Sequence, residues 1–352
     1  MFSKLKQYPH LEVRRLKPTT KILTTLTSAL TIAAGSYLGT MWFRTRKVAP
    51  ELRDAALLKH PALQSIKVWR RSFPLYASET PIHRPTKANI KQVHISSQNI
   101  PGYAGGPPVP IRVYTPEHVL SDQAIMWIHG GGYVMGTPEA DDEICAYIAR
   151  ATRCTIINPE YRLAGTAPFP AALHDCHAAY TWMQGIFPDR GITIIGQSAG
   201  GGLAACLTQW LFDEGIPPAR QVLLEPMLDD RTRITPNPGR GQFNWHHTSN
   251  TLAWNCYLSY LTPHDQIPDY AVASRRLDLT GLPPTFIAVG ALDLFYEEAL
   301  TYARRLKEQD VLVETMILPG AYHGTTIKYH QTPLMQELWV KVLKFIQPFG
   351  PV

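Results

Sequence analysis

The sequence predicts an α/β fold in which a mostly parallel sheet carries helices on both faces. Two observations support this prediction. Beyond residue 90, short apolar runs that are typical of strands alternate with longer runs of helical periodicity, and such alternation favours a parallel sheet covered on both sides. The chain also has 352 residues, of which 45% are hydrophobic and 18% charged, so it can bury the core of one large domain.

The expected elements follow in chain order from the same patterns. We expect strands at residues 92–96, 111–114, 124–128, 154–158, 193–196, 221–225, 285–289 and 314–318. We expect helices at residues 50–72, 138–152, 169–184, 199–213, 297–309 and 332–347. The proline-punctuated residues 73–90 are expected to be irregular.

One stretch, residues 231–275, interrupts this alternation. It has no clean strand pattern, and it carries six bulky aromatic residues: Phe243, Trp245, Trp254, Tyr257, Tyr260 and Tyr270. We interpret it as a helical cap inserted over the carboxyl edge of the sheet, where α/β proteins bind ligands. The alternative is a second helical layer that contacts no ligand.

The positive charge of the chain is confined to its N-terminus. The formal net charge is +6, but the first 50 residues hold nine Lys or Arg and one Glu, which leaves 25 basic and 27 acidic residues for the remainder. A protein that binds nucleic acid needs a positive groove on its folded domain to hold the phosphates. The distribution of charge therefore excludes nucleic acid from the expected partners.

An uncharged segment at residues 22–43 follows a basic tail at residues 1–21. As a helix it would span about 33 Å, close to the hydrocarbon thickness of a bilayer. Tyr37 and Trp42 lie toward its far end, where aromatic side chains favour the membrane interface. We predict a transmembrane signal anchor, with a cleaved secretory signal or a mitochondrial presequence as the alternatives. Basic residues flank both ends, so the orientation stays open.

The five cysteines suggest neither a disulfide framework nor a metal site. Cys145, Cys154, Cys176, Cys206 and Cys256 form no CxxC pair and show no metal-ligand spacing. We expect most of them to be small, buried hydrophobic residues.

A candidate nucleophile stands in the sequence Gly196-Gln197-Ser198-Ala199-Gly200. This G-x-S-x-G lies between an expected strand and an expected helix, which is the setting of a nucleophile elbow. The turn is so sharp that the neighbours of the serine must be small, and alanine and glycine satisfy this requirement. We therefore predict that Ser198 is the nucleophile.

A glycine-rich loop, His129-Gly130-Gly131-Gly132, follows an expected strand upstream of the elbow. Consecutive glycines let backbone N–H groups turn toward a developing oxyanion, and lipases and esterases carry their oxyanion loop at this position. We predict that the N–H groups of Gly131, Gly132 and Ala199 form the oxyanion hole. A tight turn at a strand end is the alternative, and we expect His129 to brace the loop rather than to act as a base.

A serine nucleophile needs a base, and the base needs an orienting acid. His323 follows the expected strand at residues 314–318 and is the predicted base. The other histidines beyond Ser198 are His246, His247, His264 and His330. Because strand-end loops meet at one edge of a parallel sheet, the imidazole of His323 can point back at the serine.

The predicted acid is Asp293, which follows the expected strand at residues 285–289. A carboxylate there can accept a hydrogen bond from the imidazole and stabilise the imidazolium. Glu297 is the first fallback, and Asp229 and Asp230 are weaker ones. The alternative role of Asp293 is that of a helix N-cap.

Together, these motifs resemble those of the hormone-sensitive-lipase-like branch of the α/β-hydrolase superfamily over roughly residues 90–350. The matching segments are His129–Gly132 with the family's HGGG, Pro159–Ala164 and Pro168–Ala172 with its PxYRLAPExxFPAA stretch, Gly196–Gly200 with its GDSAG, Asp293 to Glu298 with its DPLxDE, and His323-Gly324 with its HGF.

Three positions depart from the family pattern. Gln197 replaces the usual Asp of the elbow, residues 165–167 read Gly-Thr-Ala in place of Pro-Glu-x, and Leu294 replaces the Pro after the acid. None of these changes removes a catalytic group. Gln197, however, must alter the hydrogen bonding of the loop.

The resemblance implies an α/β-hydrolase fold and a serine hydrolase that cleaves carboxylic esters through an acyl-enzyme, without a metal or an organic cofactor. The expected substrates are short- to medium-acyl or acetyl esters of apolar or aromatic compounds. The alternatives within this fold are a biosynthetic tailoring enzyme (a deacetylase, a lactonase or an acyl-transfer enzyme) and a non-catalytic ligand-binding protein.

The domain organisation follows from these assignments. We expect a tail at 1–21, an anchor at 22–43, a cap helix and linker at 44–90, and a catalytic domain at 91–352 with its cap insertion at about 231–275. The anchor is similar to that of arylacetamide-deacetylase-like members, which implies a single-pass protein of the endoplasmic reticulum membrane. The side that the catalytic domain faces, and the choice between monomer and homodimer, stay open.

Overall fold

The computed structural model describes residues 39, 42–43, 45–54, 57, 90, 92–119, 123–188, 191–235, 239–262 and 264–347. The chain forms two compact units, Met1–Lys47 and Val48–Val352. The predicted anchor lies outside the described residues except for a few positions near its end. Within the described ranges, no helix combines the length and the apolar character that crossing a bilayer requires.

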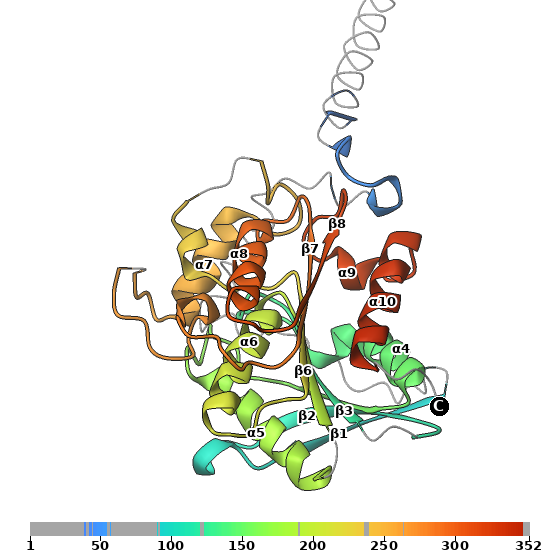
Figure 1. Ribbon diagram of the computed structural model, residues 1–352, viewed down its shortest axis with the longest axis vertical. Coiled ribbons are helices and arrows are strands. Elements are labelled where there is room, and N and C mark those ends of the chain that lie inside the picture. The colour runs from blue at the N-terminus through green and yellow to red at the C-terminus, as the bar shows by residue number, and fades with distance from the viewer. Residues whose placement is uncertain are drawn as a thin grey trace, which may run out of the picture. The chain divides into compact units, whose positions relative to one another are not determined.

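Among the described residues, eight strands form one sheet in the second unit (Figure 1). They are β1 (Val93–Ile100), β2 (Val109–Pro116), β3 (Gln123–Ile128), β4 (Thr155–Pro159), β5 (Gly191–Gln197), β6 (Arg220–Leu224), β7 (Thr285–Gly290) and β8 (Val313–Leu318). Their order in space is β1-β2-β4-β3-β5-β6-β7-β8. The strand β2 is antiparallel to β1 and to β4, and the other neighbouring pairs are parallel. The predicted, mostly parallel α/β fold is thus confirmed.

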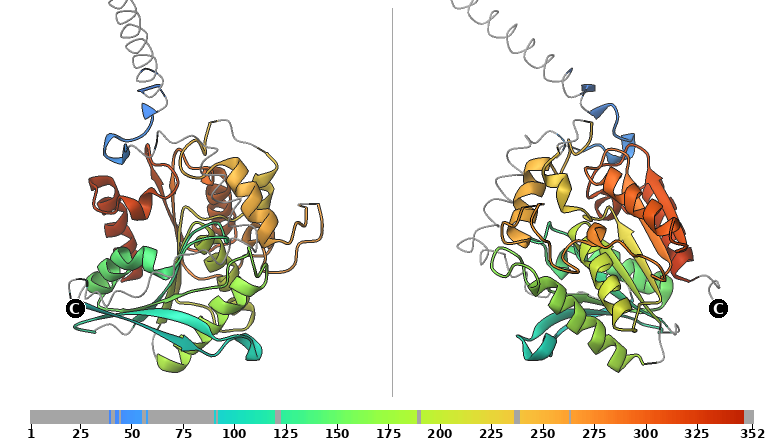
Figure 2. Two further views of the ribbon diagram at one scale, coloured as in Figure 1. Left: turned by 180° about the vertical axis from the view of Figure 1, so that it is seen from behind. Right: turned by 60° about the vertical axis from the view of Figure 1, so that its left-hand side comes forward.

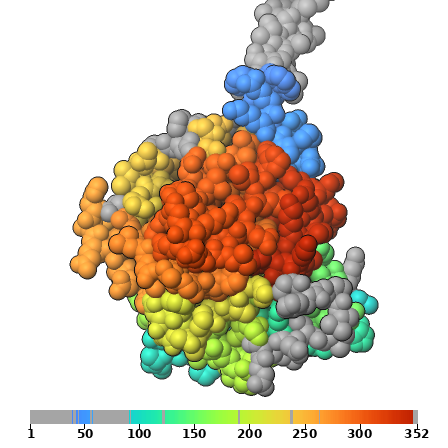
Figure 3. Space-filling view, viewed as in Figure 1, coloured from blue at the N-terminus to red at the C-terminus, as the bar shows by residue number. Residues whose placement is uncertain are grey.

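Helices cover both faces of this sheet (Figures 1 and 2). On one face lie α5 (Ala171–Ile186), α6 (Ala199–Asp213) and α8 (Tyr296–Lys307), and on the other lie α4 (Asp142–Thr152) and α10 (Pro333–Ile346). Because both sides are covered, β7 is buried along its whole length. In the space-filling view, the C-terminal part of the chain, orange to red, forms much of the surface toward the viewer (Figure 3).

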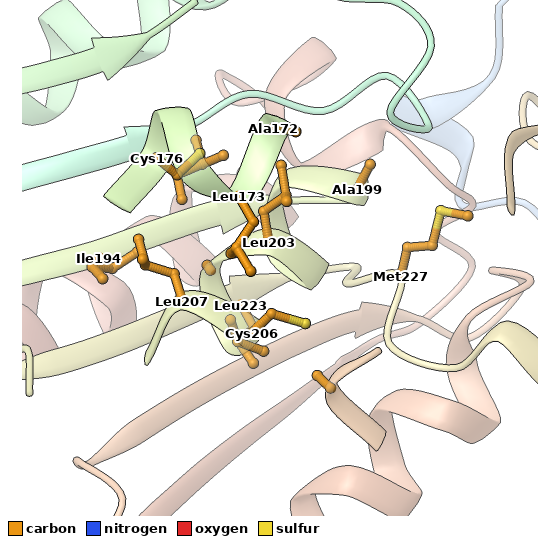
Figure 4. Packing of buried hydrophobic residues seen from close by; sticks show 14 of the residues in the cluster. Ala172, Leu173, Cys176, Ile194, Ala199, Leu203, Cys206, Leu207, Leu223 and Met227 are labelled. Carbon is orange, nitrogen blue, oxygen red and sulfur yellow. The ribbon is translucent and has the colours of Figure 1, made fainter. Parts of the chain in front are cut away.

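The packing of α6 fixes the position of the residue that precedes it, Ser198. This helix lies against α5 and the neighbouring strands through branched and small side chains (Figure 4). The residues in this part of the core include Leu173, Cys176, Ile194, Leu203, Cys206, Leu207 and Leu223. All five cysteines are buried and free, as the sequence predicts.

Short elements complete the described structure. They are the 3₁₀ turns η1 (Pro50–Leu52), η3 (Tyr103–Gly105), η4 (Pro138–Asp141), η5 (Asp230–Arg233) and η6 (Ala273–Arg275), and the helices α7 (His247–Tyr257) and α9 (Thr325–Lys328). The segment predicted as a helical cap therefore contains one α-helix, α7, between two 3₁₀ turns, and loops make up most of the rest of its described part.

The predicted helix over residues 50–72 is wrong at its start. Pro50–Leu52 forms a single 3₁₀ turn, and Arg53 is extended, with φ −83° and ψ 124°. Proline is favourable in the first turn of a helix, but tertiary hydrogen bonds draw the chain away from a helical path. Apart from Asp54 and Leu57, the remaining residues of that prediction lie outside the described part of the chain.

These hydrogen bonds tie Val48–Asp54, which we call the strap, to the segment between β8 and α10. They join the Ala49 N–H to the Gly320 carbonyl (3.0 Å), the Tyr322 hydroxyl to the Leu52 carbonyl (3.2 Å) and the Tyr329 hydroxyl to the Asp54 carboxylate (2.6 Å). Asp54 also pairs with Lys328. Val48 and Leu52 are buried, so the strap is part of the folded second unit.

Candidate active site

Ser198 occupies a sharp turn between β5 and α6. Its backbone has φ 58° and ψ −120°, a conformation that is strained for a residue with a side chain. Hydrogen bonds hold it there, because the Ser198 N–H donates to the Leu224 carbonyl and the Met227 N–H donates to the Ser198 carbonyl, both at 2.9 Å. A Cβ atom at Gly196 would collide with the carbonyl of Gly200. The glycines of the motif are therefore required by close packing of the backbone.

The structure brings Ser198, His323 and Asp293 together at the carboxyl edge of the sheet. They lie after β5, β8 and β7 respectively. The Ser198 Oγ is 2.8 Å from Nε2 of His323, and Nδ1 of His323 is 2.9 Å from Oδ2 of Asp293. The three residues are buried, with exposed fractions of 3%, 4% and 0% in the order Ser, His, Asp. This is the hydrogen-bonded sequence of nucleophile, base and acid that serine hydrolases use.

The carboxylate of Asp293 serves two structural purposes at once. Its Oδ2 faces His323, whereas its Oδ1 accepts a hydrogen bond from the Phe295 N–H at 2.9 Å, just before α8. Phe295, not Asp293, occupies the N-cap position of α8, so the hydrogen bond from the Phe295 N–H helps to hold the Asp293 carboxylate without making Asp293 the N-cap. The histidine loop is also held from the cap, because the side-chain amide of Asn244 donates to the His323 carbonyl at 2.9 Å.

The charge environment favours the protonated form of His323. Burial lowers the pKa of the imidazole, but the charge of Asp293, the hydrogen bond to it and the charge of Glu225 raise it by more. The net result is a pKa above the ordinary value for histidine. The carboxyl groups of Asp293 and Glu225 thus both favour the charged form of the imidazole.

The loop His129–Gly132 follows β3, the strand beside β5. Gly131 and Gly132 have φ values of 125° and 61°, and a Cβ atom at Gly131 would collide with the carbonyl oxygen of Met135, four residues later. In the part of the chain that the structure describes, the N–H groups of Gly131, Gly132 and Ala199 donate to no protein acceptor. They are therefore available to a substrate oxygen.

His129 braces this loop, as expected. Its Nδ1 is 2.8 Å from the Gly130 carbonyl oxygen, and its ring stacks on Tyr161 at a centroid distance of 4.1 Å. Burial lowers the pKa of His129 to about 4, so the ring is neutral at physiological pH. No hydrogen bond connects it to Ser198 among the described residues.

The cap reaches the site through Trp245. The indole lies so close to Gly132 that a Cβ atom there would collide with it, and its ring centroid is 6.1 Å from that of His323. Farther along the cap, Tyr257 of α7 stacks on Tyr133, the residue after the glycine-rich loop, at 4.0 Å. Aromatic side chains of the cap thus pack against the glycine-rich loop and the residue that follows it.

Two of the other histidines and the fallback acids are engaged elsewhere. His246 contacts the Gly241 carbonyl and His330 the Ile327 carbonyl, Glu297 pairs with Arg240, Asp229 pairs with Arg231, and Asp230 pairs with Arg233 and Arg275. The hydrogen bonds from Ser198 to His323 and from His323 to Asp293 favour these two residues over the fallbacks.

One residue near the site, Glu225, was missed by the sequence analysis, which treated it only as the end of a strand. It is fully buried, and it accepts hydrogen bonds from Gln197 (2.6 Å) and Thr326 (2.9 Å). Ligand atoms of Glu225, Asp293 and His323 lie within 4.8 Å of one another. A metal ion could use such a group, but two of its members already bond to each other in the serine–histidine–aspartate chain. The sequence feature that could have pointed to Glu225 is an acidic residue directly after an apolar strand.

Comparisons with known proteins agree with this geometry. Residues 125–327 match a family described as alpha/beta hydrolase fold. Carboxylic ester hydrolase LipN of Mycobacterium tuberculosis is 32% identical over 249 residues, which are 66% of this chain and 65% of LipN. Carboxylesterase NlhH of the same species is 28% identical over 279 residues, 74% of this chain and 87% of NlhH.

A solved structure, Bacterial Heroin Esterase, has a TM-score of 0.71 and 32% sequence identity, and the match covers 85% of this chain and 97% of that one. The matched regions contain the strands that carry Ser198, Asp293 and His323. The chain belongs to the hormone-sensitive-lipase-like branch of the α/β hydrolases, and it is a serine hydrolase of the esterase type.

Proposed function

We propose that the protein hydrolyses carboxylic esters with Ser198 as the nucleophile, His323 as the general base and acid, and Asp293 as the orienting acid. The observation that supports this assignment is the continuous chain of hydrogen bonds from Ser198 Oγ through both ring nitrogens of His323 to Asp293, with distances of 2.8 and 2.9 Å. Each residue lies on a different strand-end loop, so the sheet itself sets their geometry.

The reaction follows from these positions. Ser198 Oγ attacks the ester carbonyl carbon while Nε2 of His323 takes its proton, and Asp293 keeps the other nitrogen protonated. The N–H groups of Gly131, Gly132 and Ala199 stabilise the negative charge on the carbonyl oxygen. The alcohol leaves with the proton from His323. Water, activated by the same imidazole, then attacks the acyl-enzyme and releases the carboxylic acid.

The preferred substrates are esters with a small acyl group and an apolar or aromatic alcohol. Trp245 supports the first part, because its indole packs against Gly132 and near His323 and so limits the space beside the carbonyl carbon. The aromatic residues of the cap support the second, because Trp245 and Tyr257 place apolar rings against the glycine-rich loop and the residue after it.

The assignment is tested with the full-length protein in detergent and p-nitrophenyl esters from acetate to octanoate. Ser198→Ala is expected to abolish hydrolysis while thermal unfolding stays cooperative. Ser274→Ala is the matched control, because its hydroxyl has no hydrogen-bond partner among the described residues. An organophosphonate should label the wild type at Ser198, identified by peptide mapping. Retained activity of Ser198→Ala, or labelling at another serine, would refute the assignment.

We further propose that residues 22–43 anchor the protein in the endoplasmic reticulum membrane. The uncharged stretch between basic flanks supports this, as do Trp42 and Phe43 at its end, which are 65% and 61% exposed. Carbonate extraction of microsomes should leave the protein in the membrane pellet. Protease protection in sealed microsomes then distinguishes a lumenal from a cytosolic catalytic domain, and sedimentation of the solubilised chain distinguishes a monomer from a homodimer.

A further inference from the structure

We propose that Glu225 is a positioning residue of the active site. Its carboxylate stabilises the imidazolium of His323. Through Gln197, Glu225 also connects the oxyanion loop to the histidine loop. This inference rests on the proposed function, because it assigns His323 the role of base. It adds a second carboxylate, besides that of Asp293, to the groups that act on His323.

The backbone places Glu225 at the centre of the catalytic edge. It follows β6, the strand between β5, which ends at the nucleophile, and β7, which precedes the acid. Its φ of 42° lies in the left-handed region, which is unfavourable for a residue with a Cβ atom. The Glu225 N–H compensates by donating to the carbonyl of Ala288 at 2.6 Å. Strained residues of this kind are concentrated at functional sites.

The carboxylate is only partly satisfied by hydrogen bonds. Oε1 accepts from the side-chain amide of Gln197 at 2.6 Å and from the hydroxyl of Thr326 at 2.9 Å. Among the described residues, nothing donates to Oε2. A buried acid with one unpaired oxygen destabilises a fold. Its presence is therefore explained better by its nearness to an imidazole that becomes positively charged than by stability.

Gln197 extends this contact to the oxyanion loop. Its Nε2 faces Glu225, while its Oε1 lies so close to Gly130 that a Cβ atom at that position would collide with it. Thr326, on the other side of Glu225, lies in α9, three residues after His323. Glu225 thus joins two loops that must keep a fixed separation during catalysis, the one that binds the oxyanion and the one that carries the base.

The charges that act on Glu225 come from the two neighbouring loops. Burial raises the pKa of its carboxyl, the charge of His323 lowers it, the charge of Asp293 raises it, and the result is about 7. The charges that act on His323 come from Asp293 and from Glu225. When Glu225 is ionised, it therefore favours the imidazolium, and when it is neutral, this support is lost.

The same geometry explains the glutamine in the elbow. At residue 197 the family pattern has an aspartate, whose carboxylate would here approach that of Glu225 without a donor between them. Two buried carboxylates at such a distance repel each other, and one of them must take up a proton. Gln197 supplies an N–H donor instead, so Gln197 and Glu225 form a matched pair.

The direct test measures the titration of His323 by NMR in full-length, detergent-solubilised protein labelled with ¹³C-histidine. It uses the Ser198→Ala background, so the readout does not depend on turnover, and His323→Gln identifies the resonance. Glu225→Gln is expected to lower the pKa of His323 by roughly 0.5–1 unit. The matched control is Glu298→Gln, which removes another buried carboxyl that does not act on His323, and it should leave the resonance unmoved.

A second variant keeps the test informative if Glu225→Gln fails to fold. Thr326→Val conserves the shape of the side chain and removes one hydrogen bond to the ionised carboxylate. It should shift the pKa of His323 in the same direction by a smaller amount. If neither variant changes the titration relative to Glu298→Gln, the inference is overturned, while the assignment of Ser198 as nucleophile stands or falls separately by organophosphonate labelling.

Kinetics provide the complementary measurement in the active enzyme. Catalysis needs neutral His323, so kcat/KM rises with pH through its pKa, and Glu225→Gln should move this rise to lower pH while kcat falls about threefold to tenfold. Gln197→Asp, which restores the residue typical of the family, should also impair the enzyme, and Gln197→Asp with Glu225→Gln should recover part of the loss. Additive losses in this double-mutant cycle would contradict the matched pair.

Discussion

The catalytic edge of the sheet and the cap contribute to the same site, yet they are held in different ways. At the edge, Ser198, His323 and Asp293 each follow a buried strand and each makes a side-chain hydrogen bond shorter than 3 Å. In the cap, Trp245 reaches the site through ring packing, and its indole N–H has only a long 3.5 Å contact to Asn250. From this difference we expect changes at the sheet edge to affect the rate of the reaction and changes in the cap to affect the choice of substrate.

The largest effect is expected when the chemistry at the sheet edge is altered. Asp293→Asn keeps the shape of the side chain but permits the wrong tautomer of His323, so kcat for p-nitrophenyl acetate should fall by about 10⁴-fold. Glu297→Gln is the matched control, because Glu297 is exposed and pairs with Arg240 at 3.0 Å, away from the imidazole. Comparable losses in both variants would show that the carboxyl chemistry of this loop has been misassigned.

A smaller effect, with a different signature, is expected from the cap. Trp245→Ala opens space beside Gly132 without touching a hydrogen bond of the catalytic chain, so the ratio of kcat/KM for octanoate to that for acetate should rise about tenfold or more. Tyr260→Ala serves as a control, because Tyr260 is a cap aromatic that is 66% exposed. An unchanged acyl-length profile would show that the cap does not set the acyl selectivity.

The smallest effect is expected from the strap, which supports the sheet edge from outside. Asp54→Ala removes the hydrogen bond from Tyr329 and the ion pair with Lys328. Because these groups are partly exposed, the free energy of unfolding should decrease by only about 1 kcal/mol, measured by urea denaturation with Glu51→Ala as control. A large loss of kcat with unchanged stability would mean that the strap affects the histidine loop more directly than its contacts suggest.

Much of the catalytic edge could be predicted from the sequence because its signals are local. Each strand that precedes a catalytic loop is a short apolar run, and α6 spans the predicted residues 199–213. The elbow and the glycine-rich loop carry glycines where a Cβ atom cannot fit. The positions of these glycines in the sequence therefore indicate where the backbone turns sharply. The order of strand ends predicted His323 and Asp293, and the structure places both within hydrogen-bond distance in the Ser198–His323–Asp293 chain.

The remaining features depend on contacts between distant segments. In the sequence, Glu225 looks only like the end of a strand. Its role becomes visible in the structure, where it accepts hydrogen bonds from Gln197, 28 positions before it, and from Thr326, 101 positions after it. The structure of the strap likewise depends on contacts with a distant segment. Pro50 and the apolar stripe after it suggest a helix, but Gly320 and Tyr322 supply hydrogen bonds that favour a single turn followed by extended chain.

The five buried cysteines have a consequence for work with covalent probes. None is in a disulfide, so no cross-link has to form or survive for the catalytic unit to keep its shape in a reducing or an oxidising compartment. Burial also raises the pKa of the Cys145, Cys176 and Cys206 thiols, which stay protonated and poorly nucleophilic. An electrophile that inactivates the native enzyme is therefore expected to react with Ser198 or His323 and not with these three thiols, whose alkylation would indicate that the core has opened.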